Sequence, residues 1–207
     1  MSLNFDIFSF LVLLGACQGL ILSLYLFLSK ETVIKGKNYL GFFMLILAYN
    51  GFETFSWSSG IIFPYIRLFF ECFSFILIFG LGPSLYIYVK SLTNQKHSSS
   101  RFVFVHFVPL FLRAFVRVII IMYAIFWNNS IGFRDLTPMD LDWWDVRMAE
   151  PLSVLVFCVY LLLAFKELST FNKYKLTAQE SKSVQGEIIS RWLKIFLRCM
   201  AAFAVIW

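Results

Sequence analysis

Charged residues are scarce in this sequence. Only 14% of its 207 residues are Asp, Glu, Lys or Arg, whereas soluble domains contain about 25%. Hydrophobic residues make up 60% of the chain, and the mean hydropathy is +0.77. A soluble domain of this size must cover its core with polar groups, and this composition does not supply enough of them. The composition therefore excludes an ordinary soluble domain and favours an integral membrane protein.

Residues that carry metal or nucleophilic chemistry are also few. There are two histidines and four cysteines, and no His/Glu or paired-aspartate motif is present. The cysteines lie far apart in apolar stretches with no C-x-x-C spacing, at positions 17, 72, 158 and 199. We expect buried structural thiols, no metal, no cofactor and no enzymatic activity.

The apolar residues form runs long enough to cross a bilayer, which takes about 20 residues per helix. Continuous runs such as residues 118–122 argue against the alternating pattern of a β-barrel. The sequence predicts an all-α integral membrane protein, a single polytopic domain over residues 1–207. The six predicted spans are about 5–28, 39–61, 63–89, 102–127, 148–166 and 192–207.

Twelve of the 18 lysines and arginines lie in segments 29–38, 90–101 and 166–194. Basic loops remain in the cytoplasm, so we expect these segments inside and the N-terminus outside. The net charge of +6 is then a topology signal, which makes nucleic-acid binding by this chain improbable.

The last predicted span, from Trp192 to Trp207, has only 16 residues and contains Lys194 and Arg198. This length falls below the usual span. We expect the chain to be part of a longer protein with a seventh helix, although a short or tilted final helix is the alternative.

Several local motifs occur together in order. They are Gly15-Ala16-Cys17-Gln18-Gly19-Leu20, Lys37-Asn38-Tyr39-Leu40, Gly82-Pro83-Ser84-Leu85-Tyr86-Ile87-Tyr88 and His106-Phe107-Val108-Pro109. The series resembles the membrane-embedded N-terminal region of bacterial AraC-type helix-turn-helix transcriptional regulators. The resemblance implies about seven helices in the inner membrane, followed by a cytoplasmic DNA-binding domain. That domain is absent from residues 1–207, so DNA would be a partner only through it.

Five polar residues fall at similar depth in the predicted spans: Gln18, Glu53, Glu71, Arg113 and Arg117. Residues four apart share a helix face, so the two arginines point the same way. Ionised groups at membrane depth must be paired or hydrated, which predicts pairing of the two glutamates with the two arginines. The cluster either lines an external cavity for a small polar or anionic ligand, or fixes helix register through buried pairs.

Two prolines predict breaks in the spans. Pro109 removes a helix hydrogen bond shortly after His106, and Gly82-Pro83 interrupts the third span. His106 itself is expected to be a hydrogen-bonded residue near the interface. Tyr86 and Tyr88 are expected to anchor the cytoplasmic interface as an aromatic belt.

The two longest polar segments are expected to be loops. Segment 128–150 contains Asp140, Asp142 and Asp145 around two tryptophans. It lacks the glycine turn and distal glutamate of a calcium loop, and instead predicts an amphipathic stretch with its aspartates facing water. Segment 167–190 is expected to be a solvated cytoplasmic linker, helical in part.

These expectations favour a sensory module that detects an envelope signal and biases a cytoplasmic transcriptional domain. A structural subunit docking onto other membrane proteins, or onto further copies of itself, is the alternative. A small solute transporter is less favoured, because no internal repeat is visible.

Overall fold

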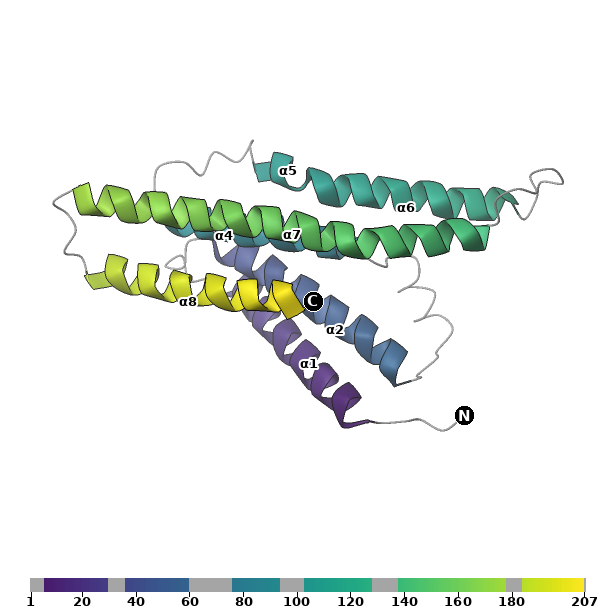
Figure 1. Cartoon of the computed structure of the whole chain (residues 1–207). Coiled ribbons are helices and arrows are strands. Elements are labelled where there is room, and N and C mark those ends of the chain that lie inside the picture. The colour runs from purple at the N-terminus through teal and green to yellow at the C-terminus, as the bar shows by residue number, and fades with distance from the viewer. Residues whose placement is uncertain are drawn as a thin grey trace.

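The computed structural model of the chain describes residues 6–29, 36–59, 76–93, 103–127, 138–177 and 184–206 (Figure 1). Every regular element in these ranges is helical, so the expected all-helical class is confirmed for them. The helices are α1 (Ile7–Leu28), α2 (Lys37–Ser58), the 3-10 helix η1 (Leu77–Gly80), α4 (Leu81–Thr93), α5 (Val103–His106), α6 (Val108–Trp127), α7 (Pro138–Thr177) and α8 (Val184–Ile206).

The 40-residue helix α7 differs most from expectation. The predicted loop is wrong from residue 138 to 150, because this stretch is helical. Residues 167 to 177 are the part of the predicted linker that is helical within α7. Pro138 occupies the first helical position, where its missing N–H costs no hydrogen bond. A line of buried residues then continues through the helix at three- and four-residue spacing: Ala149, Ser153, Phe157, Leu161, Ala164 and Leu168. This periodic face packs the apolar centre of the helix against its neighbours.

The helices α4, α6 and α8 pack against α7, whereas α1 packs against α2. As Figure 1 shows, α6 lies along the first half of α7, while α8 lies along its second half. The main core forms where α2, α4, α7 and α8 meet. Its fully buried side chains include Phe43, Leu85, Phe157, Leu193 and Leu197. The helix α8 also begins earlier than the predicted span, at Val184.

The helices α1 and α2 form an antiparallel pair with very close backbones. Ser9 Oγ donates to Ser58 Oγ at 2.9 Å, and Ser23 Oγ donates to the Gly41 carbonyl at 2.8 Å. A Cβ built on Gly51 would lie 2.9 Å from the Ala16 Cβ. Small residues therefore permit the close packing, as they do between membrane helices.

The predicted break near Pro109 is confirmed, whereas α4 runs through Gly82 and Pro83 without interruption. Phe107 separates α5 from α6, and its N–H bonds the Phe104 carbonyl at 3.0 Å in a tight turn. Pro109 follows in the first turn of α6, where its ring is tolerated. The third span changes from the 3-10 helix η1 to α4 at Gly80–Leu81, which places Pro83 in the first turn of α4.

By length and composition, two helices of the described chain are apolar enough to cross a membrane: α1, and α7 between Arg147 and Lys173. Both leave many large apolar side chains uncovered. Ile21 of α1 is 68% exposed, and Leu162 of α7 is 69% exposed.

Candidate functional site: a buried ion-pair cluster between α6 and α7

The helix α6 buries its charges and exposes its apolar residues. Among its described side chains, only Arg113 and Arg117 are buried. Phe111, Leu112 and Phe115 on the same helix are all more than half exposed. In water this arrangement would be inverted, because apolar side chains gain most from burial and charged ones lose most.

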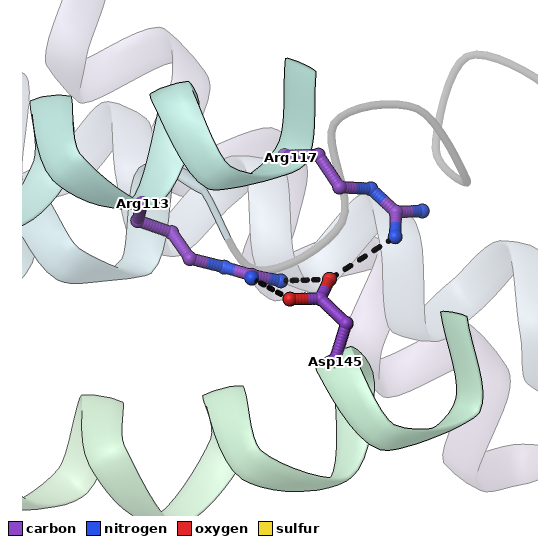
Figure 2. A network of polar contacts seen from close by, with 3 residues as sticks. All are labelled: Arg113, Arg117 and Asp145. Atoms are coloured by element: carbon purple, nitrogen blue, oxygen red, sulfur yellow. Dashed lines mark hydrogen bonds and ion pairs between the residues drawn. The ribbon is translucent and has the colours of Figure 1, made fainter. Parts of the chain in front are cut away.

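The two arginines meet Asp145 of α7 (Figure 2). The carboxylate points from α7 toward α6, and both guanidinium groups extend to it. Arg113 binds it with two N–H groups, Nη1 to Oδ1 and Nη2 to Oδ2, the second at 2.8 Å. Arg117 Nη1 donates to Oδ2 at 3.1 Å. The pattern is a bidentate pair joined by a second, monodentate one.

All three side chains are buried, with exposed fractions of 7% for Arg113, 5% for Arg117 and 8% for Asp145. A buried ion pair contributes little net stability compared with apolar packing. Removing one partner is costly, however, because an uncompensated charge is left behind. The cluster therefore selects one arrangement of α6 against α7 more than it strengthens the fold.

The Nε–H of Arg113 is a buried donor without an acceptor among the described residues. Arg113 Nε is inaccessible to solvent, and no hydrogen-bond acceptor for it lies in the part of the chain that the structure describes. An unsatisfied buried N–H costs about 1–3 kcal/mol. Arg113 therefore binds Asp145 through its two Nη atoms, and its Nε takes no part in the contact.

The structure brings together two of the five predicted polar residues, Arg113 and Arg117. Glu53 is half-buried on α2 and lies within electrostatic range of Tyr49 on the same helix. The prediction that Glu71 pairs with the arginines lies outside the described residues. Gln18 is exposed on α1 and lines a groove between α1 and α2 that includes none of the cluster residues.

Asp145 is the member that sequence reasoning missed. The expectation that it faces water on a membrane-surface stretch is wrong, because it is buried on α7. A signal for it exists in the sequence. Counting back four residues at a time from Phe157 through Ser153 and Ala149 reaches Asp145, which places it on the buried face of a continuous helix.

A second polar contact, without any charge pair, joins α7 to the short helix α5. The Tyr160 hydroxyl of α7 donates to the His106 carbonyl at the end of α5, at 2.9 Å. The His106 ring lies edge-on to Tyr86, with centroids 4.9 Å apart, and 5.9 Å from the ring of Tyr160. Lys90 Nζ lies 5.6 Å from the centre of the Tyr86 ring, within cation–π range.

The aromatic residues of α4 do not all act as interface anchors. Tyr88 is only 4% exposed, and its ring packs edge-on against Trp192 of α8 at 6.3 Å. The expectation that Tyr88 belongs to an exposed aromatic belt is therefore wrong. It is a packing residue between α4 and α8.

Of the two interpretations of the arginines, the geometry favours helix register. An anionic ligand would need the guanidinium groups as donors, but Asp145 already occupies the paired Nη atoms of Arg113 and one Nη of Arg117. Asp145 is in effect the bound carboxylate. Among the described residues no group of three or more His, Cys, Asp or Glu side chains could hold a metal ion.

Comparison with known proteins yields no relative: no protein-family model, no curated protein and no solved structure matches this chain.

Proposed function

We propose that this chain is the membrane-embedded sensory module of a transcriptional regulator. It crosses the membrane in about six spans with its N-terminus outside. It detects an envelope signal and passes it to a cytoplasmic DNA-binding domain outside residues 1–207. The buried cluster of Arg113, Arg117 and Asp145 is the contact that sets its resting state.

The observation that carries the membrane part of this proposal is the inverted polarity of α6. Among its described side chains the buried ones are arginines, and the exposed ones are all apolar: phenylalanine, leucine, valine, isoleucine and methionine. Lipid tails solvate such a surface at no cost, whereas the charges must pair inside the protein. The exposed apolar residues of α1 and α7 support the same environment.

The length of α7 supports a signalling role. Its 40 residues span about 60 Å, roughly twice the thickness of a hydrocarbon core. The ion-pair cluster lies near its start, and the contact with α8 lies near its end, where Ser190 Oγ donates to Asn172 Oδ1 at 2.7 Å. A signal that favours another packing of α6 shifts the population of α7 positions, and the far end of this helix moves with it.

Labelling in intact cells tests the membrane topology. The four native cysteines are replaced, and Ser98→Cys and Ser130→Cys are introduced singly in the loops expected inside and outside. A membrane-impermeant maleimide is expected to label Ser130→Cys in intact cells and Ser98→Cys only after lysis. Equal labelling of both in intact cells would contradict the proposed topology.

The regulatory part is tested with the native gene product at its own locus. Chromatin immunoprecipitation is expected to recover defined promoters, and Asp145→Asn is expected to change the transcripts from them. Glu150→Gln, an exposed acid on the same helix, is the matched control and leaves transcripts unchanged at equal protein abundance. A native product that binds no promoter would refute the regulatory proposal.

The second candidate function is an interaction subunit of a membrane complex. The helix α1 favours it, because its packing against α2 leaves Leu11, Ile21 and Tyr25 more than half exposed. A native product without promoter binding that copurifies with one membrane protein supports this alternative.

A further inference from the structure

The helix α1 has one side covered by α2, and most of the rest of its surface is exposed. Its buried residues, Ser9, Ala16, Ser23 and Leu26, belong to its pairing with α2. Among its exposed residues, five repeat at alternating spacings of four and three: Leu11, Gly15, Gln18, Leu22 and Tyr25. We name these five residues the α1 seam. A repeat of 3.5 residues is the period at which two helices wrap left-handedly around each other.

Gln18 stands at the centre of the α1 seam, in an otherwise apolar stretch of a 22-residue helix. Its side chain is exposed, and its amide makes no hydrogen bond among the described residues. An amide has both donors and acceptors, so two copies of it are complementary to each other. In hydrocarbon, such a group favours helix association because lipid offers it no partner.

The space around the α1 seam also suits a second helix. A Cβ built on Gly15 would meet no atom within 4 Å. Gly15, Gln18 and Leu22 also line the edge of a groove of about 400 Å³ that continues over Met44 and Leu47 of α2. Glycine allows another backbone to approach closely, and the groove accepts the side chains of that helix.

We propose that the α1 seam binds α1 of a second copy of this chain, forming a parallel dimer. The inference rests on the proposed membrane location, since all copies then insert with the same orientation. A two-fold axis along the membrane normal places each seam residue next to its equivalent. Gln18 then bonds Gln18 of the other copy, and Gly15 lies where the two helices approach most closely.

Disulfide crosslinking in native membranes tests the seam residue by residue. Single cysteines are introduced into the full chain after the native ones are replaced. The seam variants are Leu11→Cys, Gly15→Cys, Gln18→Cys and Leu22→Cys, and the controls are Ile21→Cys and Leu24→Cys. The two control residues are as exposed as the seam residues, at 68% and 48%, but lie outside the repeat.

Oxidation is expected to give dimers from the seam variants and little from the controls. Equal yields from both sets, or no dimer at all, would overturn the proposal.

Two further substitutions test its energetics. Gly15→Leu fits the open space of a single copy and blocks close approach, so it is expected to give a folded monomer in nanodiscs. Leu24→Phe adds bulk outside the seam and leaves the dimer intact. Gln18→Leu is expected to weaken dimerisation roughly three- to thirtyfold, the range for one hydrogen bond between membrane helices. A dimer that tolerates both Gly15→Leu and Gln18→Leu would rule out this interface.

The outcomes also separate this inference from the proposed function. A chain that fractionates with the membrane but stays monomeric removes only the dimer. A chain recovered in the soluble fraction removes the membrane location and the dimer together.

Discussion

The two halves of α7 are held by different kinds of contact. Its first half meets α6 through the ion pairs of Asp145 with Arg113 and Arg117. Its second half meets α8 through apolar residues such as Leu168, Leu193 and Leu197, together with one neutral hydrogen bond from Ser190 to Asn172. The charged contact is directional, since a bidentate pair has one favourable geometry. The apolar contact depends on volume and tolerates small shifts. The ion pair at α6 is either formed or broken, whereas the apolar contact at α8 can shift gradually. A change between two conformations is therefore expected at α6 and not at α8.

Asp145→Asn should have the largest effect, because it leaves two buried arginines without their carboxylate. We expect the free energy of unfolding to fall by about 3–5 kcal/mol, measured by SDS titration in mixed micelles. Glu150→Gln, on the exposed side of α7, should have little effect. A loss for Asp145→Asn no larger than the control would show that the charged contact does not hold α6.

Leu197→Ala tests the apolar contact between α8 and the second half of α7. Leu197 is 0% exposed in the core, so its truncation leaves a cavity. Core truncations of this kind cost about 2–5 kcal/mol, and we expect the lower half of that range because lipid also solvates apolar groups. Leu162→Ala, at a residue that is 69% exposed, is the control in the same titration. If Leu197→Ala lowered the free energy of unfolding more than Asp145→Asn, the apolar contact would be the stronger of the two.

Arg113→Lys and Arg117→Lys should differ, which sharpens the comparison within the cluster. Lysine cannot reproduce the fork with which Arg113 binds both oxygens of Asp145. We expect a loss of about 1.5 kcal/mol, the lower value for a hydrogen bond to a charged group. Arg117→Lys should cost less, since Arg117 uses one Nη for this contact. Equal losses in the same unfolding titration would contradict a special role for the bidentate pair.

Sequence patterns predicted the helical class, the break near Pro109 and the shared face of Arg113 and Arg117. They missed Asp145 because local composition was used to define the ends of the fifth span. Acidic and aromatic residues resemble a loop by composition, but their helical period continues that of Phe157. Several carboxylates distant in sequence could pair with a buried arginine, and the packing of the helices determines which one lies next to it. The burial of Tyr88 against Trp192 was likewise invisible, because it depends on where α8 lies.

Tyr160→Phe should have the smallest effect, because it removes a single neutral hydrogen bond, that from the Tyr160 hydroxyl to the His106 carbonyl. The aromatic ring and its contacts with Tyr86 and His106 remain. We expect a loss of about 1 kcal/mol, with no change for the control Leu162→Ala, whose side chain is 69% exposed. This bond holds α5 to α7, on the other side of the break at Phe107 from the ion pairs that hold α6 to α7. The two substitutions therefore compare how firmly each end of the α5–α6 segment is attached to α7. A small loss for Tyr160→Phe beside a large one for Asp145→Asn would mean that α6 is fixed at its charged contact and can pivot at the other. Similar losses would mean that both ends are fixed, and a rearrangement of α6 would then have to break both contacts together.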